Sequence, residues 1–244
     1  MSINDLGVVN FVQSMSRTGL GNERQLLVSF SGIDGAGKST QIAELRERLH
    51  EAGLRSVTIV FWEEVATLTD LRQFSSHTLF KGDEGVGSPL RPINRRDKNV
   101  KTWYMTLSRM GFYFLDALSL HWAVNKARNT AVDVIICDRY LFDELANLPL
   151  QSVFIRAYVR LLLKMTPRPD VAFLLDADPT EARERKPEYP VEFLHENRAA
   201  YQSLSEAVPE MIVIEPCPAS QASDQIMRAI RERLNIASQF SLAS

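Results

Sequence analysis

The sequence predicts an α/β protein in which helices flank a parallel sheet, and three observations support this prediction. Five short apolar runs alternate along the chain with segments of helical spacing, the pattern of strand-helix-strand units with right-handed crossovers. The first run, residues 26–30, leads into the glycine-rich stretch FSGIDGAGKST at residues 30–40. Another run, residues 132–137, ends directly before Asp138. Because open parallel sheets bind ligands at the carboxyl ends of their strands, we expect both of these ends to contribute to a site.

The composition is that of a single globular domain. The chain has 244 residues, of which 45% are hydrophobic, and a net charge of −2, so we expect no nucleic-acid partner. Its two cysteines, Cys137 and Cys217, form no CxxC pair, which argues against a zinc site and a disulfide framework. No stretch approaches the roughly 18 apolar residues of a membrane span, and the start lacks a signal-peptide pattern. We therefore expect a cytoplasmic protein without a membrane partner.

The stretch at residues 30–40 contains the pattern GxxxxGK[ST], formed by Gly32, Gly37, Lys38 and Ser39. Between a strand and a helix, this pattern predicts a phosphate-binding loop. The glycines let several backbone N–H groups converge on one anion, and the helix adds the positive end of its dipole. We expect Lys38 to reach the β- and γ-phosphates of a nucleoside triphosphate and Ser39 to place its hydroxyl on Mg²⁺.

A helical pattern follows from Gln41 and stops at Gly53, and a second strand is expected over residues 57–61. Glu63 and Glu64 come just after that strand. Glu63 is a candidate for binding substrate or steering an acceptor oxygen, but acidic residues are also common at a helix start. Both interpretations stand for Glu63, whereas the helix start is preferred for Glu64.

Residues 79–101 predict a long loop with a basic cluster, which is either a solvated segment or a grip on phosphates or another anionic partner. A long helix is expected over residues 100–129, and its many aromatic residues are typical of core. One edge of this helix is a candidate wall for stacking a base, with Phe112, Phe114 and Asp116 as candidate residues.

The third strand delivers Asp138 and Arg139 at its end, a Walker-B-like arrangement in which the carboxylate holds Mg²⁺ or its water shell. The planar guanidinium of Arg139 suits phosphate oxygens; a local ion pair between these two residues is the alternative. A helix over residues 151–164 and a fourth strand over 171–175 follow.

Pro179 opens a short helix that leads to a basic segment before Pro187 and Pro190. We interpret this segment as a flexible lid whose cations close over a transferring phosphoryl group, with a solvated helix end as the alternative. The rest of the chain predicts a helix to residue 207, a fifth strand over 211–214, a loop at 215–218 and a last helix over 220–234.

With these parts in order, the chain resembles the thymidylate kinase family of P-loop nucleoside-monophosphate kinases. The resemblance rests on FSGIDGAGKST at 30–40, VIICDRY at 134–140, FLLDADPTEARERK at 173–186 and ENRAAY at 196–201. It implies a three-layer P-loop NTPase fold with a five-stranded parallel sheet, and transfer of the ATP γ-phosphoryl group to a nucleoside monophosphate, foremost dTMP. It also makes a homodimer a reasonable expectation, through helices 100–129 and 151–164.

The resemblance, together with the motifs, assigns roles to named residues. The catalytic candidates are Lys38, Asp138, Arg139, Arg183 and Arg185. The candidates for binding ATP are Gly32, Asp34, Gly35, Ala36, Gly37, Lys38, Ser39, Thr40 and Lys186, with the 215–218 loop near adenine. The acceptor candidates are Asp34, Glu63, Phe112, Asp116 and Arg139, and the Mg²⁺ candidates are Ser39 and Asp138. The kinase domain is expected over residues 25–235 with a lid at about 183–190, between an N-terminal extension (1–24) and a tail (236–244).

The chain departs from the family's pattern on the acceptor side. Trp62-Glu63-Glu64-Val65-Ala66 stands where the family usually has Arg-Glu-Pro-Gly-Gly, and Asp116-Ala117 stands where it has Asp-Arg. The Ala-Tyr-Gln that tends to follow DRY is replaced by Leu145-Ala146-Asn147. Two alternatives therefore accompany the kinase of a nucleoside monophosphate: a kinase of a nucleoside or another small acceptor, and a non-catalytic P-loop protein that binds ATP.

Overall fold

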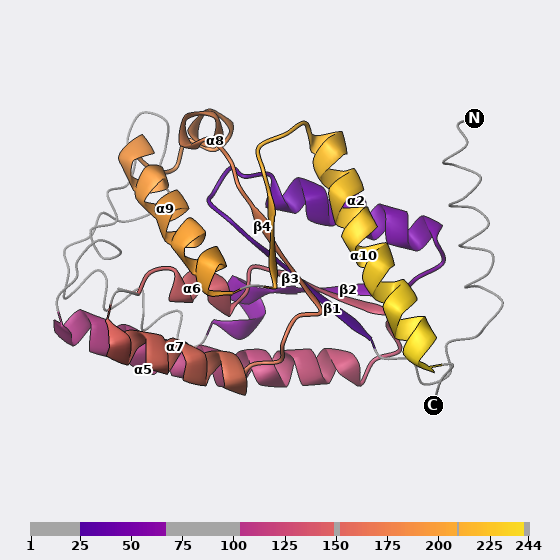
Figure 1. Cartoon of the computed structure of the whole chain (residues 1–244), viewed down its shortest axis with the longest axis horizontal. Coiled ribbons are helices and arrows are strands. Elements are labelled where there is room, and N and C mark those ends of the chain that lie inside the picture. Colours follow the sequence, from indigo (N-terminus) through magenta and orange to yellow (C-terminus); the bar gives the residue numbers. More distant parts are fainter. Residues whose placement is uncertain (1–24, 67–102, 149–151, 209, 242–244) are drawn as a thin grey trace.

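In the computed structural model, a central parallel sheet lies between two layers of helices (Figure 1). The structure describes residues 25–66, 103–148, 152–208 and 210–241. The strands are β1 (Leu26–Ser31), β2 (Ser56–Val60), β3 (Val134–Asp138), β4 (Val171–Leu175) and β5 (Met211–Ile214). They lie in the order β2-β3-β1-β4-β5, and every pairing is parallel. The α/β class and the five-stranded parallel sheet are thus confirmed.

Helices connect the successive strands, and one more helix follows the last strand. In chain order, the first helices are α2 (Lys38–Glu51), the π-helix η1 (Phe61–Val65), α5 (Trp103–Arg128) and α6 (Leu141–Leu145). Further along are α7 (Val153–Met165), α8 (Pro179–Arg185), α9 (Val191–Ala207) and α10 (Ala219–Ser241). Helices α2 and α10 pack together on one face of the sheet, and α5 with α7 covers the other (Figure 1).

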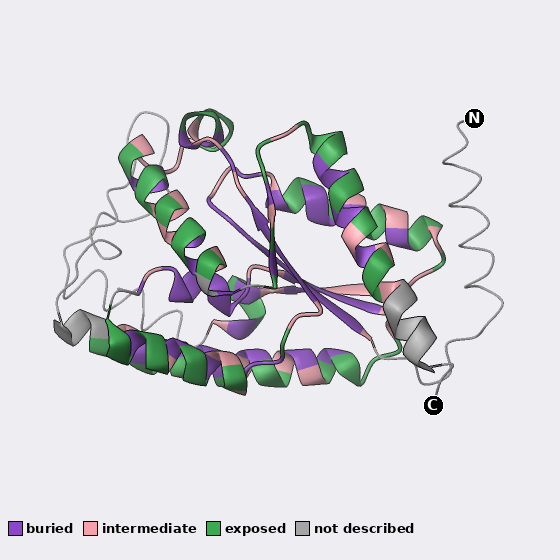
Figure 2. Ribbon diagram, in the orientation of Figure 1, coloured by how far each residue is buried: buried purple, intermediate pink, exposed green. Residues whose placement is uncertain are grey.

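The hydrophobic core surrounds the three central strands. All six residues of β1 and all five of β4 are buried, as are the first four of β3 and all five of α6, whereas the long helices bury only their inner faces (Figure 2). The near-continuous apolar runs reflect this position, because a parallel sheet is covered on both faces. β1 therefore holds the loop that follows it in a fixed place.

Three local expectations differ from the structure. The second strand ends at Val60, one residue earlier than expected, because Phe61 begins a π-turn. The Ala66 N–H donates to the Phe61 carbonyl oxygen (2.7 Å), and the Glu64 carboxylate accepts from the Val60 N–H (3.1 Å). Glu64 therefore has a local structural role at the start of this helical turn, in line with the preference for a helix-start role over a substrate-binding role.

The other two differences concern helices. The expected basic lid segment begins within helix α8 and not after it, and α8 is capped by the Asp178 carboxylate, which accepts from the N–H groups of Thr180 and Glu181. Helix α10 continues to Ser241, beyond the expected end at residue 234 and through most of the expected tail, because no glycine or proline follows Pro218. The expected N-terminal extension and the basic loop 79–101 lie outside the described residues.

Candidate active site

The loop between β1 and α2 has the backbone that phosphate binding requires. Gly32, Gly35 and Gly37 have φ angles of 141°, 84° and 87°. A Cβ atom on Gly32 would overlap the carbonyl oxygen of Leu175, and one on Gly35 would overlap that of Ala182. Two of the glycines are therefore required by close packing against neighbouring backbone as well as by their torsion angles. The amino-terminal turn of α2 opens directly after this loop, as an anion site at a helix terminus needs.

Lys38 is buried at the base of the loop. Its Nζ donates to the carbonyl oxygens of Gly32 and Ile33, both at 2.8 Å. Burial, and after it the positive charge of Arg139, lowers the pKa of the Lys38 ammonium from 10.5 to about 8. Ser39 and Thr40, the next two residues, are exposed, so their hydroxyls are accessible at the start of α2.

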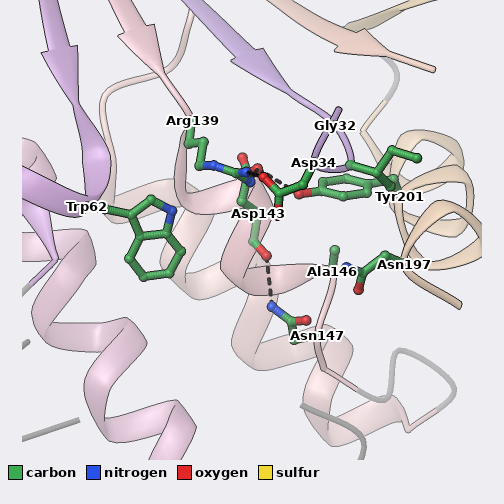
Figure 3. Close-up of a pocket in the computed structure, with 10 residues that line it drawn as sticks. Gly32, Asp34, Trp62, Arg139, Asp143, Ala146, Asn147, Asn197 and Tyr201 are labelled. Atoms are coloured by element: carbon green, nitrogen blue, oxygen red, sulfur yellow. Dashed lines mark hydrogen bonds and ion pairs between the residues drawn. The ribbon is translucent and has the colours of Figure 1, made fainter. Parts of the chain in front are cut away.

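Arg139 lies at the centre of a polar cluster beside this loop (Figure 3). Its Nη2 donates to Asp34 Oδ1 at 2.5 Å, and its Nη1 donates to Asp143 Oδ1 at 2.9 Å. Tyr201 of α9 also donates to Asp143 Oδ1, at 2.6 Å. The ion pairs of Arg139 thus run to Asp34 and Asp143, not to its neighbour Asp138 as the alternative interpretation had it.

The charges of this cluster reinforce one another. Burial works to lower the pKa of the Arg139 guanidinium, but the nearby Asp143, Tyr201 and Asp34 groups outweigh burial and raise that pKa above its ordinary value. Burial also raises the pKa of the Tyr201 phenol well above its ordinary value, and the Asp143 carboxylate adds to this effect. Arg139 therefore stays charged and Tyr201 stays a hydrogen-bond donor across the physiological pH range.

Asp138, the expected Mg²⁺ ligand, ends β3 and is half-buried. Within the described residues its carboxylate makes no hydrogen bond or ion pair, which suits a group that holds a hydrated cation. The described residues contain no group of three or more acidic, histidine or cysteine side chains placed so that they could hold a metal ion by themselves. That is compatible with Mg²⁺, which is bound by one or two protein groups together with substrate phosphates.

Two pockets meet at the phosphate loop. The first, here called the acceptor-side pocket, is shown in Figure 3 and is lined by Gly32, Ile33, Asp34, Trp62, Arg139, Asp143, Ala146, Asn147, Asn197 and Tyr201. The second, here called the donor-side pocket, has a volume of about 590 Å³. Its lining includes Ala36, Gly37 and Thr40 of the loop, Glu181 and Arg185 of α8, and residues 215–218. One loop therefore borders both pockets.

The lid cations occupy different positions. Arg185 lines the donor-side pocket, and its Nε donates to the Glu181 carbonyl oxygen at 3.2 Å. Lys186 faces the other way, with Nζ 3.8 Å from Asp34 Oδ1 and 3.4 Å from Glu188 Oε2. Arg183 is half-buried on α8.

The acceptor candidates are only partly brought together. Asp34 and Arg139 line the acceptor-side pocket, whereas Glu63 is exposed and outside its described lining. Phe112 and Asp116 of α5 are also outside this lining; Asp116 is fully buried. These three residues remain predictions.

Sequence reasoning missed several lining residues. Trp62, 37% exposed, lies at one side of the acceptor-side pocket, where the family resemblance led us to look for an arginine. The others form two pairs with a spacing of four residues, Asp143 with Asn147 and Asn197 with Tyr201. In α9 such spacing places Asn197 and Tyr201 on one helix face, a signal by which they could have been found, whereas Asn147 lies beyond the end of α6 and has no such signal.

The phosphate loop, the two pockets that it borders and the Arg139 cluster define a P-loop nucleotide kinase. No protein-family model matches the chain. It is similar to a probable thymidylate kinase of Methanosphaera stadtmanae, with 25% identity over 216 residues that cover 86% of this chain and all of that protein. A thymidylate kinase of Chlorobaculum parvum is 27% identical over 213 residues, 78% of this chain and 87% of that one. A probable thymidylate kinase of Archaeoglobus fulgidus is 24% identical over 223 residues, 86% and 97% of the two chains. These similarities over most of the chain support its assignment to the thymidylate kinase family.

Proposed function

We propose that this protein transfers the γ-phosphoryl group of ATP to a nucleoside monophosphate, with dTMP as substrate and dTDP and ADP as products. The observation that carries the proposal is the shared loop: Asp34 lines the acceptor-side pocket, and Gly37 and Thr40 line the donor-side pocket. The similarity to thymidylate kinases over most of the chain supports dTMP as the acceptor.

In this reaction a phosphate oxygen of the acceptor attacks the γ-phosphorus, and the bond to the oxygen that bridges the β- and γ-phosphates breaks. The protein's task is positioning and charge neutralisation. The backbone of residues 32–37 and Lys38 would hold the donor phosphates, and the free N–H groups of Arg139 would contact the oxygens between donor and acceptor. Arg183, Arg185 and Lys186 would add positive charge from the lid side.

Ser39 and Asp138 would hold Mg²⁺, Ser39 through its exposed hydroxyl and Asp138 through the water shell. Magnesium supplies neutralisation of the charge on the phosphate oxygens. Adenine would bind in the donor-side pocket, beside residues 215–218. The pocket volume of about 590 Å³ suits a nucleotide base.

A second acceptor class is favoured by one observation. The charged side chains of the described pocket lining are two carboxylates, Asp34 and Asp143, and one guanidinium, Arg139. This balance favours an uncharged acceptor over a phosphate dianion, and a nucleoside phosphorylated at a hydroxyl is the second candidate.

A coupled ADP-release assay across nucleoside monophosphates, with the matching nucleosides in parallel, separates these functions. We expect turnover of dTMP and its loss in Lys38→Ala. Turnover of thymidine without turnover of dTMP would support the second candidate. ATP binding without phosphorylation of any acceptor would instead indicate a regulatory P-loop protein.

We also propose a homodimer formed through α5 and α7. These adjoining helices expose an unusual number of large apolar side chains, among them Leu107, Leu115, Leu118, Trp122, Val153, Phe154 and Leu161. Trp122 is 74% and Phe154 70% exposed. Apolar surface of this extent on a protein is typical of an interface. Within the described residues, no helix has the length and apolar character needed to cross a bilayer.

A further inference from the structure

Asp143 is a buried carboxylate whose hydrogen-bonding capacity is fully used. Its Oδ1 accepts from Arg139 Nη1 (2.9 Å) and Tyr201 Oη (2.6 Å). Its Oδ2 accepts from Ser31 Oγ (2.7 Å) and the Tyr140 N–H (3.1 Å). The side chain is 2% exposed. Because the four donors come from β1, from Arg139 and Tyr140 in the β3–α6 turn, and from α9, this carboxylate is fixed in place by three separate parts of the chain.

Arg139 has a backbone and a side chain that both need to be held. With a φ of 68° it is the one non-glycine residue of the described chain in the left-handed region. Such a conformation costs on the order of 1–3 kcal/mol, and it persists only where the surroundings impose it. Here the Arg139 N–H donates to the Phe30 carbonyl oxygen at 3.0 Å, which anchors the backbone.

The guanidinium is held at two points. A single ion pair with Asp34 would let the plane of the guanidinium turn, and the Asp34 carboxylate also faces Lys186. The second attachment, from Nη1 to Asp143, fixes that plane because Asp143 is itself immobilised. Of the five N–H donors of an arginine, those not used by these carboxylates remain for phosphate oxygens.

Tyr201 links the same carboxylate to the lid. It is buried on α9, the helix that directly follows α8 and the lid residues. Helix α9 is in turn attached to the end of β4 by a bidentate ion pair between Arg198 and Asp176, with distances of 2.7 and 2.6 Å. The position of α9 therefore affects where Asp143 Oδ1 lies, and this oxygen accepts the hydrogen bond from Arg139.

We propose that Asp143 is a positioning residue for phosphoryl transfer, which fixes the orientation of the Arg139 guanidinium, and that Tyr201 fixes Asp143 relative to α9. The inference rests on the proposed function, in which Arg139 contacts the transferring phosphoryl group.

Steady-state kinetics of two variants test it. Asp143→Asn keeps the size of the side chain but replaces an acceptor oxygen by a donor; we expect kcat to fall about 100-fold, the effect of a small misplacement of a reacting group. Tyr201→Phe removes one donor and should lower kcat about 10-fold. In both variants the KM for ATP should stay near the wild-type value. The matched control is Tyr158→Phe, which removes a phenol that donates to the Met110 carbonyl oxygen between α7 and α5, and it should keep its kcat.

A double-mutant cycle separates positioning from general stability. If Asp143 acts through Arg139, Asp143→Asn should cost much less in an Arg139→Lys background than in the wild type. The same fold-loss in both backgrounds would overturn the inference, since a merely structural role is indifferent to the residue at position 139. If Asp143→Asn does not fold, the cycle is built with Tyr201→Phe.

A readout without substrate keeps this inference distinct from the proposed function. In ¹⁵N NMR spectra, a guanidinium held by two carboxylates should show separate Nη resonances, assigned to Arg139 by their loss in Arg139→Lys. These resonances should merge in Asp143→Asn, and unchanged resonances would refute the positioning role. A wild-type protein that phosphorylates no nucleoside monophosphate would refute the proposed function alone.

Discussion

Replacing Gly35 by alanine should destabilise the protein through the contact between the phosphate loop and α8. Gly35 has a φ of 84°, and a Cβ atom there would overlap the carbonyl oxygen of Ala182. Gly53 is the matched control because its φ of 73° is similar, while a Cβ on it would meet no atom within 4 Å. Gly35→Ala and Gly53→Ala therefore share the cost of a left-handed backbone, and only Gly35→Ala adds an overlap with the Ala182 carbonyl oxygen.

The structure gives a magnitude for each substitution. A left-handed conformation costs a residue with a Cβ roughly 1–2 kcal/mol, so Gly53→Ala should lose about that much free energy of unfolding. At Gly35 the obstacle is backbone, which moves only if α8 shifts, and relief of such overpacking adds about 1–3 kcal/mol. The expected loss for Gly35→Ala is therefore about 2–5 kcal/mol.

Urea unfolding of both variants, with unchanged m-values, measures the difference. The KM for ATP should also rise in Gly35→Ala, because Arg185 of α8 lines the donor-side pocket, and should not change in Gly53→Ala. Equal losses of unfolding free energy in the two variants would refute the packing of α8 on the loop.

Three other predictions address the donor side, the metal and the dimer. Cys217 lines the donor-side pocket, so ATP should slow its alkylation by iodoacetamide. Cys137 should not react with or without ATP, because it is buried and burial raises the pKa of its thiol to about 12. Alkylation of Cys217 at the same rate with and without ATP would contradict the proposed base site. Asp138→Asn should raise the Mg²⁺ concentration for half-maximal rate by about 10–100-fold, as for other groups that act through a metal's outer shell, and an unchanged Mg²⁺ titration would remove Asp138 from the metal site. Trp122→Glu should shift the sedimenting species from dimer to monomer while the exposed α10 control Gln221→Glu does not, and a monomeric wild-type protein would refute the dimer.

The donor half of the candidate site could be located in the sequence because its parts are local. The phosphate loop is one continuous stretch between β1 and α2, and its spacing alone selects Lys38 and Ser39 as candidates. The same holds for Asp138 and Arg139 at the end of a buried strand. The parallel sheet was also predictable, since its strands are apolar runs separated by helical patterns.

The acceptor half was less predictable because its residues come from separate elements. Trp62 belongs to a π-turn, whose i to i+5 bonding has no strong sequence pattern, and Tyr201 belongs to α9, far along the chain. The ¹⁴¹LFDEL¹⁴⁵ segment of α6 is only five residues long, too short for helical periodicity to reveal. Its acidic residues look like exposed charges at a helix start, yet Asp143 is buried.

The burial of Asp143 explains why Arg139 alone did not indicate the geometry of the site. A sequence shows that an arginine follows Asp138, but not that its guanidinium points away from that neighbour toward two other carboxylates. That direction follows from the left-handed backbone of Arg139 and from a carboxylate that only the packing of α6 against α9 places within reach. The position of the Arg139 guanidinium between the donor and acceptor sides therefore depends on tertiary structure. The phosphate-loop motif and the Asp138-Arg139 motif, in contrast, are each encoded in one short stretch of sequence.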